Sequence, residues 1–581
     1  MSQHLFYSTK STGTYADTLA AFGLAEIVKG ILEQTSERAW SGDRILLRDD
    51  GPYYVIELPK PLPENWVEQC KYFNPAQPIS TPKHKWDGKA KARDYDAEWS
   101  HFKQYLKTAE NLREAAHKAG VEANLPEPPS PDFWVLAFLG DYRMQALNGY
   151  NEAIHQWEET KKFFTLNIET ILQMSETPYP DVEAIGKAWA KTIGKNGGKR
   201  ERRVSQLFNP IQGEGQHHPK ANRLNTRNWV EAFWLLEFLK GVGLWKCAIP
   251  RTVSGDDDRK TYVVSPKRIS LGVHEEVFVK FGASLWNETA VKMDIVAALL
   301  YAQTLIEYSE EKRQIEERIP DKVVAGLYVT TYKRLSQNSY TVMNLAFIGI
   351  PEWIGEISTR EEAKSAQGVI TEHLQIIKSV RTINEKGRNL ERDEVYKLLA
   401  DYRDFLSGRQ LGSFFDFCTG YSQYLAHELK EKHYWIKPFT SNNLRRLFMG
   451  TEQNLSEIID NEGFRRIASA IRRSTITPLY LGDSSMYEVR YGLGMELKRK
   501  AAFPKEFLGA LSDFLQTYNE ENARKSAKSG QQRRTNYREE DLAEVVRLVE
   551  KFGSEIVCHL LIAFGYASES DDDKPTKNAN K

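Results

Sequence analysis

A glycine-punctuated segment, NPIQGEGQHHPKANR at positions 209–223, gathers amide, imidazole and cationic side chains in a short stretch of chain. Asparagine and glutamine amides pair a donor with an acceptor and can read base edges, whereas lysine and arginine bind phosphates. Gly213 and Gly215 allow positive φ and a close approach of the backbone to a partner. The segment therefore predicts a nucleic-acid reader. The alternative is a helix-entry loop whose polar groups satisfy only its own backbone.

A second group of candidate residues is basic and begins in FRRIASAIRRS, at positions 464–474. Its two arginine pairs are seven residues apart, which is about two helical turns, so we expect both pairs on one helix face. Further basic residues follow at 490, 498–500 and 524–534, and we expect the last stretch to be a loop because it lacks large apolar side chains. Such a surface suits phosphates held without sequence reading. An ordinary solvated face is the alternative.

An acidic turn, Asp256–Asp258, is the strongest catalytic signal, because adjacent aspartates can hold metal ions for nucleotidyl transfer. Cations follow it directly, no second acidic strand end completes a site, and exposed hairpin turns often carry aspartate. His217 and His218 are adjacent and so cannot chelate as i,i+4 helix ligands do. Phosphate-loop, nucleophile-elbow and zinc-protease motifs are missing. We therefore predict no active site, cofactor or metal. A metal-dependent nucleotide cyclase or nuclease at Asp256–Asp258 remains the alternative.

Composition limits the class of protein. Acidic and basic residues both number 79, so the formal net charge of the 581-residue chain is zero. This excludes a protein that coats nucleic acid through bulk charge but permits local basic surfaces. The four cysteines are far apart without a CxxC pair, which excludes a zinc ribbon and favours a reduced compartment. No apolar run is long enough for a membrane span and no secretion signal is visible, so we expect a soluble, cytoplasmic protein.

The elements that must position these residues change in kind along the chain, which predicts an α+β fold. We expect a mixed α/β region over 1–355, a helical bundle over 356–566 and a disordered tail over 567–581. The first region has expected helices at 18–33, 94–118 and 229–239, the last ended by Gly241 and Gly243, and expected hairpins at 44–58, 249–264 and 327–348. Ser358-Thr359-Arg360-Glu361 has the capping-box pattern that begins the helical region.

Several segments resemble the large subunit of type I CRISPR effector (Cascade) complexes, with subtypes I-B and I-A as the nearest branches. They are LFNPIQGEG (207–215), PKAN (219–222), GFRRIASAIRRST (463–475), YEVRYGLG (487–494) and FLQTYNEEN (514–522). Glu214 stands where this pattern has a basic residue, and its carboxylate would repel phosphate at that point of the loop.

The resemblance implies a non-catalytic subunit that recognises the protospacer-adjacent motif in duplex DNA, helps to unwind it and supports the displaced strand, while base pairing reads the sequence. Implied partners are a CRISPR RNA complex with backbone, handle-binding and small subunits, the target DNA, and helicase-nuclease or transposition proteins. The helical bundle would resemble the small subunit. Met449 could start a separately translated copy of it, or it could be an ordinary helix residue.

Carried onto this chain, the resemblance assigns two sets of residues. The motif-recognition set is Asn209, Gln212, Gly213, Gly215, Lys220, Asn222 and Arg223. The strand-backbone set is Arg465, Arg466, Arg472, Arg473, Arg490 and Lys498. A purely protein-binding helical adaptor, whose arginines contact acidic partners, is a further alternative. The motif that is read, the subtype and the downstream effector stay open.

Overall fold

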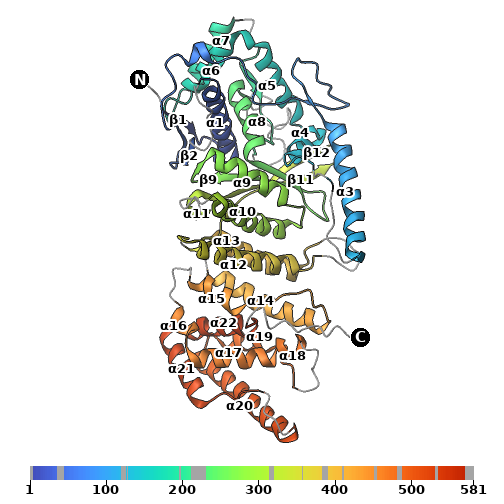
Figure 1. Cartoon of the computed structure of the whole chain (residues 1–581), viewed down its shortest axis with the longest axis vertical. Helices are drawn as coiled ribbons and strands as arrows, with labels where there is room; N and C mark the ends of the chain where they lie inside the picture. The colour runs from blue at the N-terminus through green and yellow to red at the C-terminus, as the bar shows by residue number, and fades with distance from the viewer. Residues whose placement is uncertain are drawn as a thin grey trace, which may run out of the picture. The chain divides into compact units, whose positions relative to one another are not determined.

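The fold is α+β, as the sequence predicts, in a computed structural model of the chain (Figure 1). The structure describes residues 4–35, 45–119, 126, 129–194, 198–210, 231–312, 320–355, 357–382, 390–408, 411–449, 455–480, 487–529 and 534–569. Two compact units divide the chain. An α/β unit comprises Met1–Glu288 and Asp321–Ile350, and a helical unit comprises Thr289–Pro320 and Pro351–Lys581.

Two four-stranded antiparallel sheets form the frame of the α/β unit. The first has the order β1 (Leu5–Thr9), β3 (Tyr53–Glu57), β2 (Leu46–Asp49), β10 (Arg268–Ser270). The second has the order β12 (Ser339–Gly349), β11 (Val324–Ser336), β9 (Arg259–Pro266), β8 (Ala248–Thr252). Two short ladders pair β4 (Ile79–Ser80) with β5 (Arg93–Asp94) and β6 (Glu201–Arg203) with β7 (Glu231–Phe233). All three predicted hairpins are present as β2–β3, β8–β9 and β11–β12.

The helices of the α/β unit surround these sheets, and two of them cross at glycines. They are α1 (Tyr15–Thr35), α2 (Trp66–Gln69), α3 (Tyr95–Ala119), α4 (Phe133–Gly140), α5 (Leu147–Glu159), α6 (Phe164–Gln173), α7 (Val182–Ile193), α8 (Trp234–Cys247) and α9 (Leu271–Ser284). Short 3₁₀ turns η2 (Tyr142–Met144) and η3 (Lys161–Phe163) join some of them, and α11 (Pro320–Val323) leads into β11.

The predicted end of the helix at Gly241 and Gly243 is wrong, because α8 continues through both to Cys247. A Cβ on Gly243 would lie 1.9 Å from the carbonyl oxygen of Leu19 on α1, and a Cβ on Gly23 would lie 2.0 Å from the carbonyl oxygen of Leu239. These glycines therefore serve the close approach of two buried helices and not a helix stop.

The helical unit contains α10 (Ala290–Lys312), η6 (Glu352–Ile354), α12 (Arg360–Ser379), α13 (Asp393–Gly408), α14 (Leu411–Lys430), α15 (Ser441–Met449), α16 (Ser456–Ile459), α17 (Glu462–Ser474), α18 (Ile476–Tyr480), α19 (Leu493–Lys500), α20 (Pro504–Ser529), α21 (Glu539–Phe552) and α22 (Ser554–Gly565). Within it, α22 packs against both α17 and α14 (Figure 1). The sequence placed α10 in the first region, but this helix packs against α12 and α13.

Three local expectations in the helical unit need correction. The capping box that starts α12 consists of Thr359 and Glu362, one residue later than predicted. The first residues of the expected loop 524–534 form the last turns of α20. Arg534, at the end of that stretch, is buried, and its guanidinium lies 3.4 Å from the ring centroid of Tyr487. Residues 567–569 are ordered: Ser568 donates its backbone N–H to the Phe439 carbonyl at 2.8 Å. Residues 570–581 lie outside the described residues.

Candidate nucleic-acid interface

Of the first candidate segment, 209–223, the structure describes only Asn209 and Pro210. Gln212, Gly213, Gly215, Lys220, Asn222 and Arg223 lie outside the described residues. Asn209 is buried, its amide donating to a Glu237 carboxylate oxygen at 3.0 Å while its oxygen accepts a hydrogen bond from Lys240. With both ends of the amide engaged by α8, Asn209 does not fit the predicted role of a base reader. Its side chain instead holds the chain before position 211 against α8, and after position 230 β7 pairs with β6.

The arginine pairs of α17 do not form one exposed face. Arg465 is exposed and hydrogen-bonds Asp460 at 2.7 Å, whereas Arg472 is buried against Glu569 at 2.5 Å, Ser441 and the Phe564 carbonyl. Equal helical phase does not give equal exposure, because α22 and the segment after it cover Arg472. Arg472 is therefore a structural residue, which corrects the prediction of a strand-binding role for it.

The other members of the strand-backbone set have varied surroundings. Arg466 contacts Glu462 and Asp541, and Lys498 contacts Asp416 at 2.6 Å. Arg473 and Arg490 are half-buried, and the Arg490 guanidinium lies 5.4 Å from the Phe514 ring centroid. Exposed ion pairs contribute only about 0.2–1 kcal/mol, so phosphate can compete for the exposed cations. Binding of the strand backbone by Arg465, Arg466, Arg473, Arg490 and Lys498 stays a prediction.

The acidic turn of the β8–β9 hairpin is neutralised by neighbouring cations. Lys333 on β11 lies 3.3 Å from Asp256 and 2.9 Å from Asp258, and Arg334 pairs with Asp257. Within the described part of the chain, no group of three or more His, Cys, Asp or Glu side chains is arranged to hold a metal ion. The turn thus has a structural explanation in the contacts that join two neighbouring hairpins.

A different basic segment, the turn that follows α14, presents its side chains to solvent. Helix α14 ends with His433 N–H donating to the Glu428 carbonyl at 2.8 Å and Lys432 N–H donating to the Leu429 carbonyl at 3.0 Å. This pattern is a Schellman motif, in which glycine usually takes the left-handed position. Here that position is held by Lys432, with φ +62°. A lysine therefore replaces glycine at a conformational cost.

The turn is anchored to the aromatic core of the helical unit. Ile436 and Phe439 are buried, and the Phe439 ring packs against His373 and Phe414. Burial lowers the pKa of His373 to about 3, so this core imidazole is neutral at physiological pH. Tyr480 donates its hydroxyl to the Ile436 carbonyl at 3.2 Å. These contacts fix the backbone from which the exposed side chains project.

One exposed aromatic of the turn is held in a stack. The Arg381 guanidinium lies 3.7 Å from the Trp435 ring centroid, and the His433 ring lies 4.2 Å from it. Both groups are therefore in contact with the indole ring. His433 in turn contacts the Glu428 carboxylate through Nδ1 at 2.8 Å. Trp435 thus positions the cation Arg381 and is itself 40% exposed.

Two further rings are open to solvent and have lysines beside them. Tyr434 is 50% exposed, and no hydrogen bond or ring contact within the described residues engages its side chain. Tyr491 is 40% exposed, with the Lys430 ammonium 5.4 Å from its ring centroid. We call the exposed set the aromatic–basic surface; it consists of Arg381, Lys430, Lys432, Tyr434, Trp435, Lys437 and Tyr491.

Sequence reasoning passed over this surface, although KEKHYWIKP at 430–438 interleaves cations with aromatic rings. The segment lies between two helices, and its rings could equally have been core residues. Exposure of Tyr434 beside buried Ile436 is decided by the helix end and not by local composition.

Comparison with known proteins gives no match, either to a protein-family model or to a curated protein. Within the described residues, none of the helices combines the length and the apolar character that crossing a membrane requires.

Proposed function

We propose that this chain is the large, non-catalytic subunit of an RNA-guided DNA-recognition complex of type I, and that its helical unit holds nucleic acid on the aromatic–basic surface. The observation that carries the proposal is the rigidly held turn with free tyrosine rings set among lysines. Stacking of bases on aromatic rings, combined with cations that follow the phosphates, is the usual way to bind a single strand without reading its sequence. The displaced strand of the target DNA is the proposed ligand.

The motif-recognition role is proposed for Gln212, Gly213, Gly215, Lys220, Asn222 and Arg223, without Asn209. The described chain on either side of positions 211–230 supports it, because Asn209 is held on α8 and β7 is paired with β6, and a reading loop needs a firm base. The proposed partners are the guide-RNA complex with its backbone, handle-binding and small subunits, and a helicase-nuclease or transposition proteins downstream.

The test is binding of fluorescent single-stranded oligothymidylate to the purified full chain at several salt concentrations. Phosphate contacts make the logarithm of affinity fall with the logarithm of salt concentration, by about 0.7 per contact for single strands. Tyr434→Ala is expected to weaken binding by about 1–3 kcal/mol, and Tyr434→Phe, which keeps the ring, is expected to bind like the parent.

Two results would contradict the proposal. A chain that binds no DNA at any salt concentration, while it binds other proteins, would be an adaptor. Turnover of nucleotide with Mg²⁺ that is lost on Asp256→Ala and Asp257→Ala would favour the enzyme alternative. Co-purification of a discrete short RNA with co-expressed partner proteins would support the guide-RNA part of the proposal.

A further inference from the structure

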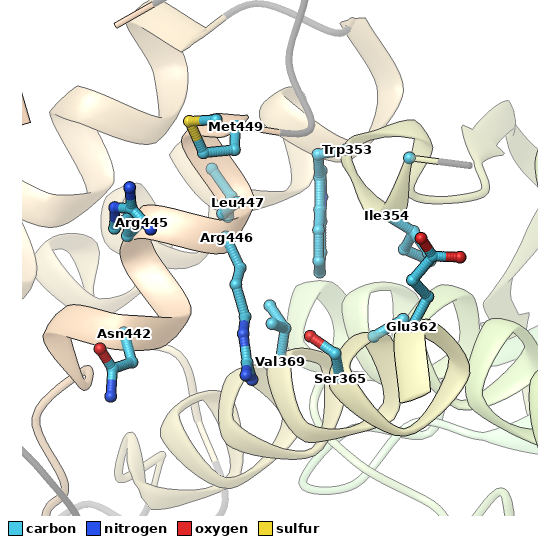
Figure 2. Close-up of a pocket in the computed structure, with 12 residues that line it drawn as sticks. Trp353, Ile354, Glu362, Ser365, Val369, Asn442, Arg445, Arg446, Leu447 and Met449 are labelled. Atoms are coloured by element: carbon cyan, nitrogen blue, oxygen red, sulfur yellow. The ribbon is translucent and has the colours of Figure 1, made fainter. Parts of the chain in front are cut away.

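A cavity of about 680 Å³ opens between η6, α12 and α15 in the helical unit (Figure 2). Its volume is within the range of small-ligand sites, about 300–1,000 Å³. The lining mixes apolar, charged and amide side chains, among them Trp353, Glu362, Ser365, Asn442, Arg446 and Leu447. None of these residues belongs to the aromatic–basic surface, so the cavity is a separate candidate.

Arg446 supplies a cation that the fold leaves largely uncommitted. Within the described residues, its guanidinium makes one hydrogen bond, of 3.4 Å, to the amide oxygen of Asn443. The neighbouring Arg445 differs, because Asp460 accepts from it at 3.0 Å through each carboxylate oxygen. Figure 2 shows the Arg446 side chain extending from α15 toward Val369 and Ser365 on α12. We therefore expect an anionic group in the cavity to pair with Arg446 and not with Arg445.

Glu362 supplies an acceptor on the other side of the cavity. One of its carboxylate oxygens accepts the backbone N–H groups of Ser358 and Thr359, at 2.7 and 2.9 Å, in the capping box of α12. These bonds lower the pKa of Glu362, so the group stays ionised. The second carboxylate oxygen can accept from a ligand hydroxyl or amino group.

Trp353 stands between these two charged groups in Figure 2. Its ring is fixed by packing on His373, with centroids 4.9 Å apart, and runs parallel to Phe405, and at 7% exposure only a small part of it faces the cavity. Leu447 and Val369 add apolar walls. The cavity thus offers a fixed aromatic wall, a cation on one side and an ionised acceptor on the other.

We infer that this cavity binds a single nucleotide unit, with its phosphate at Arg446 and Ser365, its base at the exposed part of Trp353 and the neighbouring apolar lining, and its ribose hydroxyls or base amino group at Glu362. A nucleotide supplies an anion, a flat ring and hydrogen-bond donors on one small molecule. An acidic peptide would instead bring further carboxylates toward Glu362. The residues that line this cavity are distinct from those of the aromatic–basic surface, so nucleotide binding here is independent of the proposed strand binding.

The test is titration of the full chain with AMP and UMP by saturation-transfer NMR and calorimetry, with adenosine, ribose 5-phosphate and the dipeptide Glu-Leu as comparison ligands. Arg446→Gln is expected to weaken AMP binding about tenfold and to leave adenosine binding unchanged, because a charge-assisted hydrogen bond to phosphate is lost. Glu362→Gln, which can keep the capping box, is expected to weaken AMP and adenosine alike. Arg547→Gln on α21, also exposed, is the matched control and should bind like the parent.

Comparing AMP with the 5′-phosphorylated dinucleotide pApA decides whether the bound nucleotide is free or belongs to a strand. Tighter binding of pApA indicates a nucleotide within or at the end of a strand, and its exclusion indicates a free nucleotide. The inference is overturned if AMP binds no better than ribose 5-phosphate, if Arg446→Gln leaves AMP binding unchanged, or if Glu-Leu binds in place of AMP. Oligothymidylate binding that persists in Arg446→Gln would leave the proposed function intact.

Discussion

Replacing Lys432 by glycine is expected to stabilise the helical unit and to weaken its binding of single-stranded DNA. Lys432 holds the left-handed position of the Schellman motif at the end of α14, with φ +62°. An L-residue with a Cβ pays about 1–2 kcal/mol there, and glycine avoids this strain. Glycine also loses more conformational entropy on folding, by about 0.5–1 kcal/mol. The free energy of unfolding should therefore rise by up to about 1.5 kcal/mol.

The same substitution removes one cation of the aromatic–basic surface. Loss of one phosphate contact lowers the salt slope by about 0.7, and extrapolation from 1 M to 0.1 M salt converts this into about a fivefold loss of affinity. A change that stabilises the fold while it weakens binding separates a role in binding from a role in structure.

The assay pairs urea denaturation with oligothymidylate titration over a range of salt. Lys432→Asn serves as the matched control, because asparagine tolerates left-handed backbone and carries no charge; it should bind like the glycine variant. Lys432→Arg should keep the parent's affinity. Undiminished affinity and salt slope in the glycine and asparagine variants would refute a phosphate contact at Lys432. An unfolding free energy that falls in the glycine variant would refute the strain argument.

Three further predictions concern the fold and the corrected assignments. The pKa of His373 is about 6.5 in the unfolded chain and about 3 in the folded protein. The free energy of unfolding is therefore highest above pH 6.5 and falls as the pH drops, by about 2 kcal/mol at pH 5. His373→Phe should remove that part of the pH dependence of unfolding. Gly243→Ala should cost about 1–3 kcal/mol or more in denaturation experiments, because its Cβ meets the α1 backbone, whereas Gly509→Ala, which points into open space, should be neutral or stabilising. Asn209→Ala should destabilise the α/β unit by about 1–3 kcal/mol, because Glu237 and Lys240 lose a buried partner. An unchanged unfolding temperature in this variant would show that the buried contacts of Asn209 with Glu237 and Lys240 contribute nothing to stability.

Local patterns in the sequence predicted those elements whose causes are local. The hairpin at 44–58 follows from Asp50-Gly51 between two β-rich runs, and Gly51 has the positive φ, +86°, that such a turn needs. Helix α3 follows from its apolar periodicity. The start of α12 was predicted within a residue, because a capping box is written in four consecutive side chains. In each case the decisive interactions join residues that are close in sequence.

Contacts between residues far apart in sequence decided the rest. The sequence predicts a helix end at Gly243, but the structure shows α1 packed against this glycine. It predicts a surface cation at Arg472, but α22 and Glu569 cover that side chain. The sequence predicts a free amide at Asn209, but Glu237 and Lys240 of α8 hydrogen-bond with it. The sequence by itself determined the α+β class, the hairpins and the nucleic-acid hypothesis. Tertiary structure decided which polar groups are buried and which stay in water, because burial depends on what the rest of the chain places over them.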